Sequence, residues 1–247
     1  MTLFEILMLM AAGVVGGSVN AIAGGGTFFT FPVLIAAGLD PLTANASNAV
    51  AIFPGSAAAV PAYREELRRA ENLVRRGVIA AFGALLGAGM LLWAGGAAFA
   101  KLVPFLIFTA TLLFAFGPAI RGLAEKAKSH SPFFNGAIEF LFAVYGGYFG
   151  AGLGILLMAS LTIVGVRDIQ MANAQKNLIS TIISTISVSI FIFAGVIAWP
   201  QTLSVLVGAV FGGYMGARVA RKVPARVLRA VVISIGLGLS VFYFMKL

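Results

Sequence analysis

The sequence has no cysteine, a single histidine and few charged residues, and each shortage excludes a class of protein. Without cysteine there is no disulfide and no thiolate chemistry, and His130 alone cannot complete a zinc or haem site. Asp, Glu, Lys and Arg make up 10% of the residues, whereas soluble domains carry about 25%. We therefore expect neither a soluble domain nor a metal or redox enzyme, and we expect no cofactor.

Apolar residues dominate what is present. They account for 60% of the chain, and the mean hydropathy is +1.03. Several apolar runs reach the roughly 18 residues that a helix needs to cross a ~30 Å hydrocarbon layer. The first run lacks a basic start and carries Glu5, so we interpret it as membrane structure and not as a cleaved signal. The composition predicts an all-α membrane protein in a lipid bilayer.

The net charge of +9 would indicate nucleic acid as a partner in a soluble protein. Most of the basic residues, however, fall in three short loops between apolar runs, which is the pattern that orients a membrane protein. We therefore expect no nucleic-acid partner and place all three loops in the cytoplasm. The loops contain Arg64, Arg68, Arg69, Arg75 and Arg76; then Arg121, Lys126 and Lys128; then Arg218, Arg221, Lys222, Arg226 and Arg229.

The positions of these loops fix a topology. Six segments are expected to cross the membrane once each, at about residues 44–62, 77–98, 102–120, 173–198, 202–218 and 227–245. Residues 3–38 and 133–165 must then begin and end on one side, the first outside and the second inside. The halves 1–122 and 130–247 therefore have opposite orientations, which is an inverted repeat with both termini outside.

Each half begins with an apolar hairpin that glycines interrupt. The arms after the glycines, 27–38 and 155–165, are about 12 and 11 residues, or roughly 18 and 16 Å as helix, and do not span the bilayer. We expect re-entrant helical hairpins that enter from opposite faces, each followed by three transmembrane helices. Two short but complete crossings are the alternative.

If the short arms are helices, their N-termini point free amides and positive dipole ends at the membrane centre, where they would attract an anion. The candidate binding tips are Gly24, Gly25, Gly26 and Thr27 in the first half and Gly150, Gly152 and Gly154 in the second. Close helix packing is the alternative role for these glycines. Packing is also the role expected of Gly83, Gly87, Gly212 and Gly216.

Polar residues at the start of the helix after each hairpin complete the candidate site. Asn48, Lys176 and Asn177 are the candidate ligands, and Lys176 would add a full positive charge. Snorkelling to the interface is the alternative for Lys176, and Asn45 and Asn173 are candidate helix N-caps. Glu139 is the acid inside an apolar run and hence a candidate for proton coupling, with snorkelling again the alternative.

At these residues the chain resembles the TauE/SafE sulfite exporter family, the transmembrane sulfite/organosulfonate permease group. The motifs are NAIAGGGT with ANASNAVAIFPG in the first half, and YGGYFGAGLG with NAQKNLISTI and AGVIAW in the second. The resemblance implies a bacterial inner-membrane carrier that exports sulfite or small sulfonates. Many members carry Asp where this chain has Asn20 and Gly146, so a proton route through those acids is not expected here.

We therefore expect a secondary transporter of small sulfur oxyanions that works by alternating access. A passive small-anion channel remains an alternative, because dipoles and amides also serve channels. A carrier of another small anion, such as a carboxylate, is a second alternative. A membrane-embedded enzyme would need a nucleophile with a base, or metal ligands, at one membrane depth, and the sequence shows neither.

Overall fold

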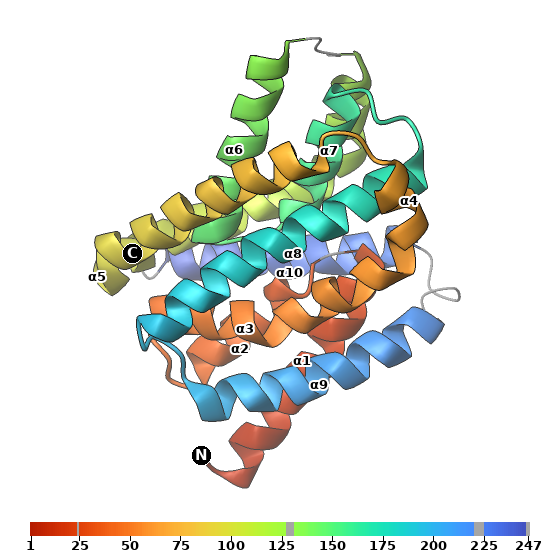
Figure 1. The fold of residues 1–247 in the computed structure, drawn as a ribbon. Helices are drawn as coiled ribbons and strands as arrows, with labels where there is room; N and C mark the ends of the chain where they lie inside the picture. Colours follow the sequence, from red (N-terminus) through yellow and green to blue (C-terminus); the bar gives the residue numbers. More distant parts are fainter. Residues whose placement is uncertain (24, 127–130, 220–224, 246–247) are drawn as a thin grey trace.

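The computed structural model describes residues 1–23, 25–126, 131–219 and 225–245, and these residues form helices without any strand (Figure 1). The helices are α1 (Leu3–Ala23), α2 (Thr27–Ala36), α3 (Pro41–Ala59), η1 (Val60–Tyr63), α4 (Arg64–Arg69), α5 (Leu73–Lys126), α6 (Pro132–Tyr148), α7 (Leu153–Ile163), α8 (Ile169–Phe193), α9 (Trp199–Val219) and α10 (Ala225–Phe244). Gly24, Lys128, His130, Arg221 and Lys222, which the sequence analysis names, lie outside the described residues.

Helix α5 consists of two helices that run in opposite directions. The break is at Gly95, whose φ of 75° and ψ of 171° lie outside the helical region. The segment from Gly147 to Gly152 contacts both sides of this break: a Cβ at Gly147 would lie 2.5 Å from the carbonyl oxygen of Ala84, and one at Gly152 would lie 3.7 Å from that of Ala110. A straight helix would separate positions 84 and 110 by about 39 Å, whereas five residues of chain span at most about 18 Å. The predicted pair of crossings at 77–98 and 102–120 is therefore a helical hairpin with its turn at Gly95.

Three helices among the described residues are long and apolar enough to cross a membrane: the segment Leu3–Asn20 of α1, α5 and α8. The sequence analysis expects six crossings. Part of the difference is that α5 counts once although it folds back at Gly95. Helix α3 contains Asn45, Ser47 and Asn48, whose polar side chains lower its mean hydropathy, and all three are buried inside the protein.

Helices α1 and α9 pack closely along glycines and run in the same direction (Figure 1). A Cβ at Gly13 would lie 2.2 Å from the carbonyl oxygen of Val205, and one at Gly17 would lie 2.2 Å from that of Ala209. Higher residue numbers on α1 meet higher numbers on α9, so the two helices are parallel. Gly212 of α9 is equally close to α1. This confirms its predicted packing role.

The first part of α5 packs against α6 in the same way. A Cβ at Gly83 would lie 2.8 Å from the carbonyl oxygen of Phe140, and one at Gly87 would lie 2.1 Å from that of Val144. On α6, a Cβ at Gly147 would lie 2.5 Å from a carbonyl oxygen of α5. This pair is also parallel. The packing roles of Gly83 and Gly87 are confirmed, whereas the surroundings of Gly216 are outside the described residues.

Aspartates, and not the predicted asparagines, cap the helices that follow the hairpins. Asp40 accepts hydrogen bonds from the amides of Leu42 (3.1 Å) and Thr43 (3.2 Å) at the start of α3. Asp168 accepts one from the amide of Met171 (2.6 Å) at the start of α8. The predicted capping role of Asn45 and Asn173 is therefore wrong, because these carboxylates already bond the free amides one turn earlier.

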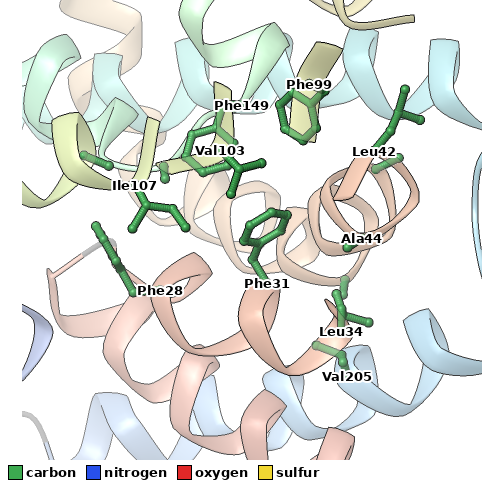
Figure 2. Close-up of a cluster of buried hydrophobic side chains, with 14 of the residues drawn as sticks. Phe28, Phe31, Leu34, Leu42, Ala44, Phe99, Val103, Ile107, Phe149 and Val205 are labelled. Atoms are coloured by element: carbon green, nitrogen blue, oxygen red, sulfur yellow. The ribbon is translucent and has the colours of Figure 1, made fainter. Parts of the chain in front are cut away.

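Helix α2 lies at the centre of the hydrophobic core. Phe31 and Leu34 are almost fully buried, and they pack with Phe99 of α5, Phe149 after α6 and Val205 of α9. Figure 2 shows these side chains converging from helices that are distant in the sequence. The core therefore holds the first short helix in place against both halves of the chain.

Candidate functional site

The start of α2 and the turn before α7 lie at one place in the core. The Phe31 ring of α2 lies 5.7 Å from the Phe149 ring, edge to face, at the turn before α7 (Figure 2). A narrow, largely apolar pocket separates the two turns. It is lined by Thr27, Phe28, Phe31, Pro32, Ile107, Phe149, Ala151 and Leu239. The structure thus brings Thr27 together with the turn that contains Gly150 and Gly152.

At the first turn, the glycines are required by close packing. A Cβ at Gly25 would lie 2.7 Å from the Phe114 ring, and one at Gly26 would lie 2.5 Å from the carbonyl oxygen of Gly16. Gly26 has ordinary helical angles, with φ −56° and ψ −35°, so it does not use the left-handed conformation that only glycine tolerates well. Gly24 lies outside the described residues.

Asn48 of α3 is bonded to the first turn of α2. Its Nδ2 donates to Thr27 Oγ1 (3.2 Å), and its Oδ1 accepts from the hydroxyl of Thr30. Asn48 is 3% exposed, so both of its side-chain polar atoms are satisfied within the protein. The amide therefore orients the two threonines, and Thr27 is the member of this group that lines the pocket.

The second turn is a different structure. Gly150 and Gly152 have φ values of 76° and 77°, a region that favours glycine, so here the backbone conformation does require these residues. The Tyr145 hydroxyl donates to the carbonyl oxygen of Ala151 (2.5 Å). Asn45 of α3 donates to the carbonyl oxygen of Tyr148 (3.1 Å). The first half of the chain thus fixes the hairpin turn of the second.

Lys176 of α8 lies beside the N-terminus of α7. Its side chain is half-buried, its Cδ lies 3.8 Å from where a Cβ on Gly154 would be, and its Nζ donates to Asn173 Oδ1 (3.4 Å). The ammonium group is therefore held near the first turn of α7. Asn177 is half-buried on the same helix, and no hydrogen bond joins its side chain to the described residues of either turn.

The two halves place a polar residue in equivalent positions. Asn48 follows the capping Asp40 at the same spacing as Lys176 follows the capping Asp168. Each reaches the first turn of the short helix that precedes it in the chain, Asn48 through Thr27 and Lys176 over Gly154. One half thus supplies a neutral amide and the other half a cation.

Glu139 of α6 is bound to a partner that the sequence analysis did not select. Its Oε1 lies 3.3 Å from Nε of Arg76 at the start of α5, and Arg76 Nη1 donates to Gln175 Oε1 of α8 (2.6 Å). The sequence analysis counts Arg76 among the loop residues that set orientation. A buried acid requires a nearby cation, and that requirement is the signal that could have identified Arg76.

The comparisons with known proteins all find membrane transporters. A family model described as sulfite exporter TauE/SafE matches residues 9–243. A probable membrane transporter protein ORF9 from Sinorhizobium sp. is 25% identical over 96% of this chain and 92% of its own length. A probable membrane transporter protein from Haemophilus influenzae is 27% identical over 92% of this chain and 90% of its own length.

A third relative is the probable membrane transporter protein YfcA from Escherichia coli K12. It is 24% identical over 94% of this chain and 87% of its own length. No solved structure matches the chain. Because the family model covers nearly the whole length and the apolar helices are those of an integral membrane protein, the chain belongs to the sulfite exporter TauE/SafE family of membrane transporters.

Proposed function

We propose that this protein is a secondary transporter that exports small sulfur oxyanions, such as sulfite or organosulfonates, across the bacterial inner membrane. The observation that carries the proposal is that Thr27, in the first turn of α2, and Ala151, in the turn before α7, line one pocket. Helix N-termini carry a partial positive charge, which favours an oxyanion. The family of the chain supports the sulfur chemistry.

The protein works by alternating access between the inverted halves 1–122 and 130–247. By their order in each half, α1 corresponds to α6, and the first part of α5 corresponds to α9. The parallel packing of α1 on α9 therefore has its counterpart in the parallel packing of α6 on α5, and this supports the arrangement. In each half the short helix comes after a turn. A glycine with positive φ follows shortly after its end, Gly38 after α2 and Gly165 after α7. The re-entrant hairpins, the cytoplasmic basic loops and the outside termini remain part of this proposal.

The anion is held between the turns by backbone amides and by polar side chains. Gly25, Gly26 and Thr27 form one side, and Gly150, Gly152 and Gly154 form the other, while the remaining candidate, Gly24, lies outside the described residues. Lys176 supplies the charge that neutralises the anion, while Asn48 holds Thr27 in position. Asn177 joins the site when the turns separate, because in this conformation aromatic rings close the pocket.

The test is sulfite or sulfonate flux in proteoliposomes. Replacing Lys176 with Ala removes the cation beside α7, and flux is expected to fall about tenfold to a hundredfold, since a charge-assisted contact contributes about 1.5–3 kcal/mol. The matched control is Lys101→Ala, which removes an exposed lysine of α5. Unchanged flux in Lys176→Ala with normal expression would remove Lys176 from the site.

A passive small-anion channel is the second candidate, and the closed pocket argues against it. A channel needs a continuous wet path, whereas Phe31 and Phe149 pack edge to face between the two turns. Uptake driven by an imposed proton gradient would support a carrier, and an electrodiffusive current would support a channel. Competition of the flux by carboxylates would separate sulfur oxyanions from other small anions as substrate.

A further inference from the structure

A buried ion pair joins the two halves at a distance from the hairpin turns. Arg76 and Glu139 are each 7% exposed, and Gln175, which accepts from Arg76, is 3% exposed. Burying two charges costs free energy that their attraction often fails to repay, so such a pair is weak evidence for a role in stability. Ionisable residues inside membrane proteins more often mark the path of a substrate or a proton.

The position of this pair fits the route of an anion. Arg76 lies in the first turn of α5, close after the basic helix α4, and α4 itself packs against α8. Gln175 directly precedes Lys176 on α8, and Lys176 lies beside the first turn of α7. Arg76 is therefore placed between the basic end of the molecule and the cation of the proposed binding site.

We propose that Arg76 is a second anion-binding residue, and that the Glu139 carboxylate occupies it when no substrate is present. This inference rests on the proposed function. A carboxylate and a sulfonate both offer oxygens to a guanidinium group, so Glu139 imitates the substrate's oxyanion. When an anion arrives, Glu139 takes up one proton from the solution at the basic end and leaves Arg76. One proton and one anion are thus bound together.

The charged groups around Glu139 allow this exchange. Arg75 also lies against α6, with its Nη2 3.2 Å from where a Cβ on Gly136 would be, and it acts electrostatically on Glu139. Helix α7 has no charged residue, and the charged residue of α8 is Lys176, which donates to Asn173. Glu139 is the charged residue of α6. Its protonation therefore leaves Arg76 without its carboxylate partner, and an anion can neutralise that positive charge.

The test measures binding of methanesulfonate to the purified full chain in detergent by calorimetry, at mildly acidic and mildly basic pH. Methanesulfonate is the anion of a strong acid, so its own charge is constant. We expect the wild type to bind about tenfold more weakly at basic pH, where Glu139 holds Arg76. In Glu139→Gln, affinity at basic pH rises about tenfold and the pH dependence disappears. The matched control, Glu125→Gln, neutralises an exposed carboxylate near Arg121 and keeps the wild-type pH dependence.

The double variant Arg76→Gln/Glu139→Gln removes both charges and is expected to bind about tenfold more weakly than Glu139→Gln. Equal affinity of the two would overturn the assignment of Arg76 as a ligand. Binding that is independent of pH in the wild type would also overturn the inference, and this measurement needs no variant if Glu139→Gln fails to fold. Absence of binding in every protein, wild type included, would instead overturn the proposed function.

Discussion

At the scale of single residues, Asn48 and Lys176 hold equivalent positions in the two halves but differ in their contacts. The Nδ2 and Oδ1 of Asn48 each bond a threonine in the first turn of α2, Thr27 and Thr30, so Asn48 is a positioning residue for that turn. Lys176, the equivalent residue of the second half, has one long hydrogen bond to Asn173, which leaves its ammonium group with capacity for a further partner. The charged member of the pair is therefore the one expected to contact the anion.

Replacing Asn48 with Ala is expected to lower the free energy of unfolding by about 1–3 kcal/mol, because the Thr27 hydroxyl loses its donor and the buried Thr30 hydroxyl loses one of its two acceptors. Transport should fall as well, since Thr27 lines the pocket. Thermal unfolding in detergent and proteoliposome flux measure the two effects. Gln170→Ala, at an exposed position of α8, is the control. Wild-type stability and flux in Asn48→Ala would show that the threonines do not depend on this amide.

The sequence supplied candidate residues for the site but not their contacts. Glycine spacing identified Gly150 and Gly152, where a positive φ is found, because only the backbone conformation is involved. Glycine spacing could not show that Gly25 and Gly26 serve close packing, because that role depends on Phe114 and Gly16 in other helices. Arg76 was assigned to a loop for the same reason, because its partners Glu139 and Gln175 are remote in the chain.

At the scale of helices, glycines set the distance between the parallel pairs. Packing of small residues drives helix association in a bilayer, where no hydrophobic force acts between helices. The order of the long described helices agrees with the hydrophobic pattern, and the breaks before α2 and α7 lie at glycines as predicted, whereas the short helices η1 and α4 lie where the end of a crossing and a loop were predicted. The pairing of α1 with α9 could not be predicted, because it depends on which faces meet in three dimensions.

Gly87 and Gly89 provide a matched pair on one helix. A Cβ at Gly87 would lie 2.1 Å from the carbonyl oxygen of Val144, whereas one at Gly89 would meet no heavy atom within 4 Å. Gly87→Ala is expected to lower the free energy of unfolding by about 1–3 kcal/mol through overpacking. Gly89→Ala should be neutral or up to about 1 kcal/mol stabilising, because Ala is the better helix former. Equal melting temperatures of the two variants would contradict the close packing of α5 on α6.

At the scale of the whole molecule, the account requires two halves of opposite orientation. The absence of cysteine allows single cysteines to be introduced without a background. A cysteine at Glu66, in α4, is expected to react with an impermeant maleimide only from the cytoplasm. One at Ala97, just after the break in α5, is expected to react only from outside. Labelling of both positions from the same side would refute the topology.

The central claim is that the N-terminal turns of α2 and α7 form one anion site, and the most direct measurement is X-ray diffraction from crystals grown with bromomethanesulfonate. The account predicts an anomalous bromine peak between the two turns, with the sulfonate oxygens within hydrogen-bonding distance of backbone amides and of Lys176 Nζ. A well-occupied peak elsewhere in the protein, with none between the turns, would contradict it.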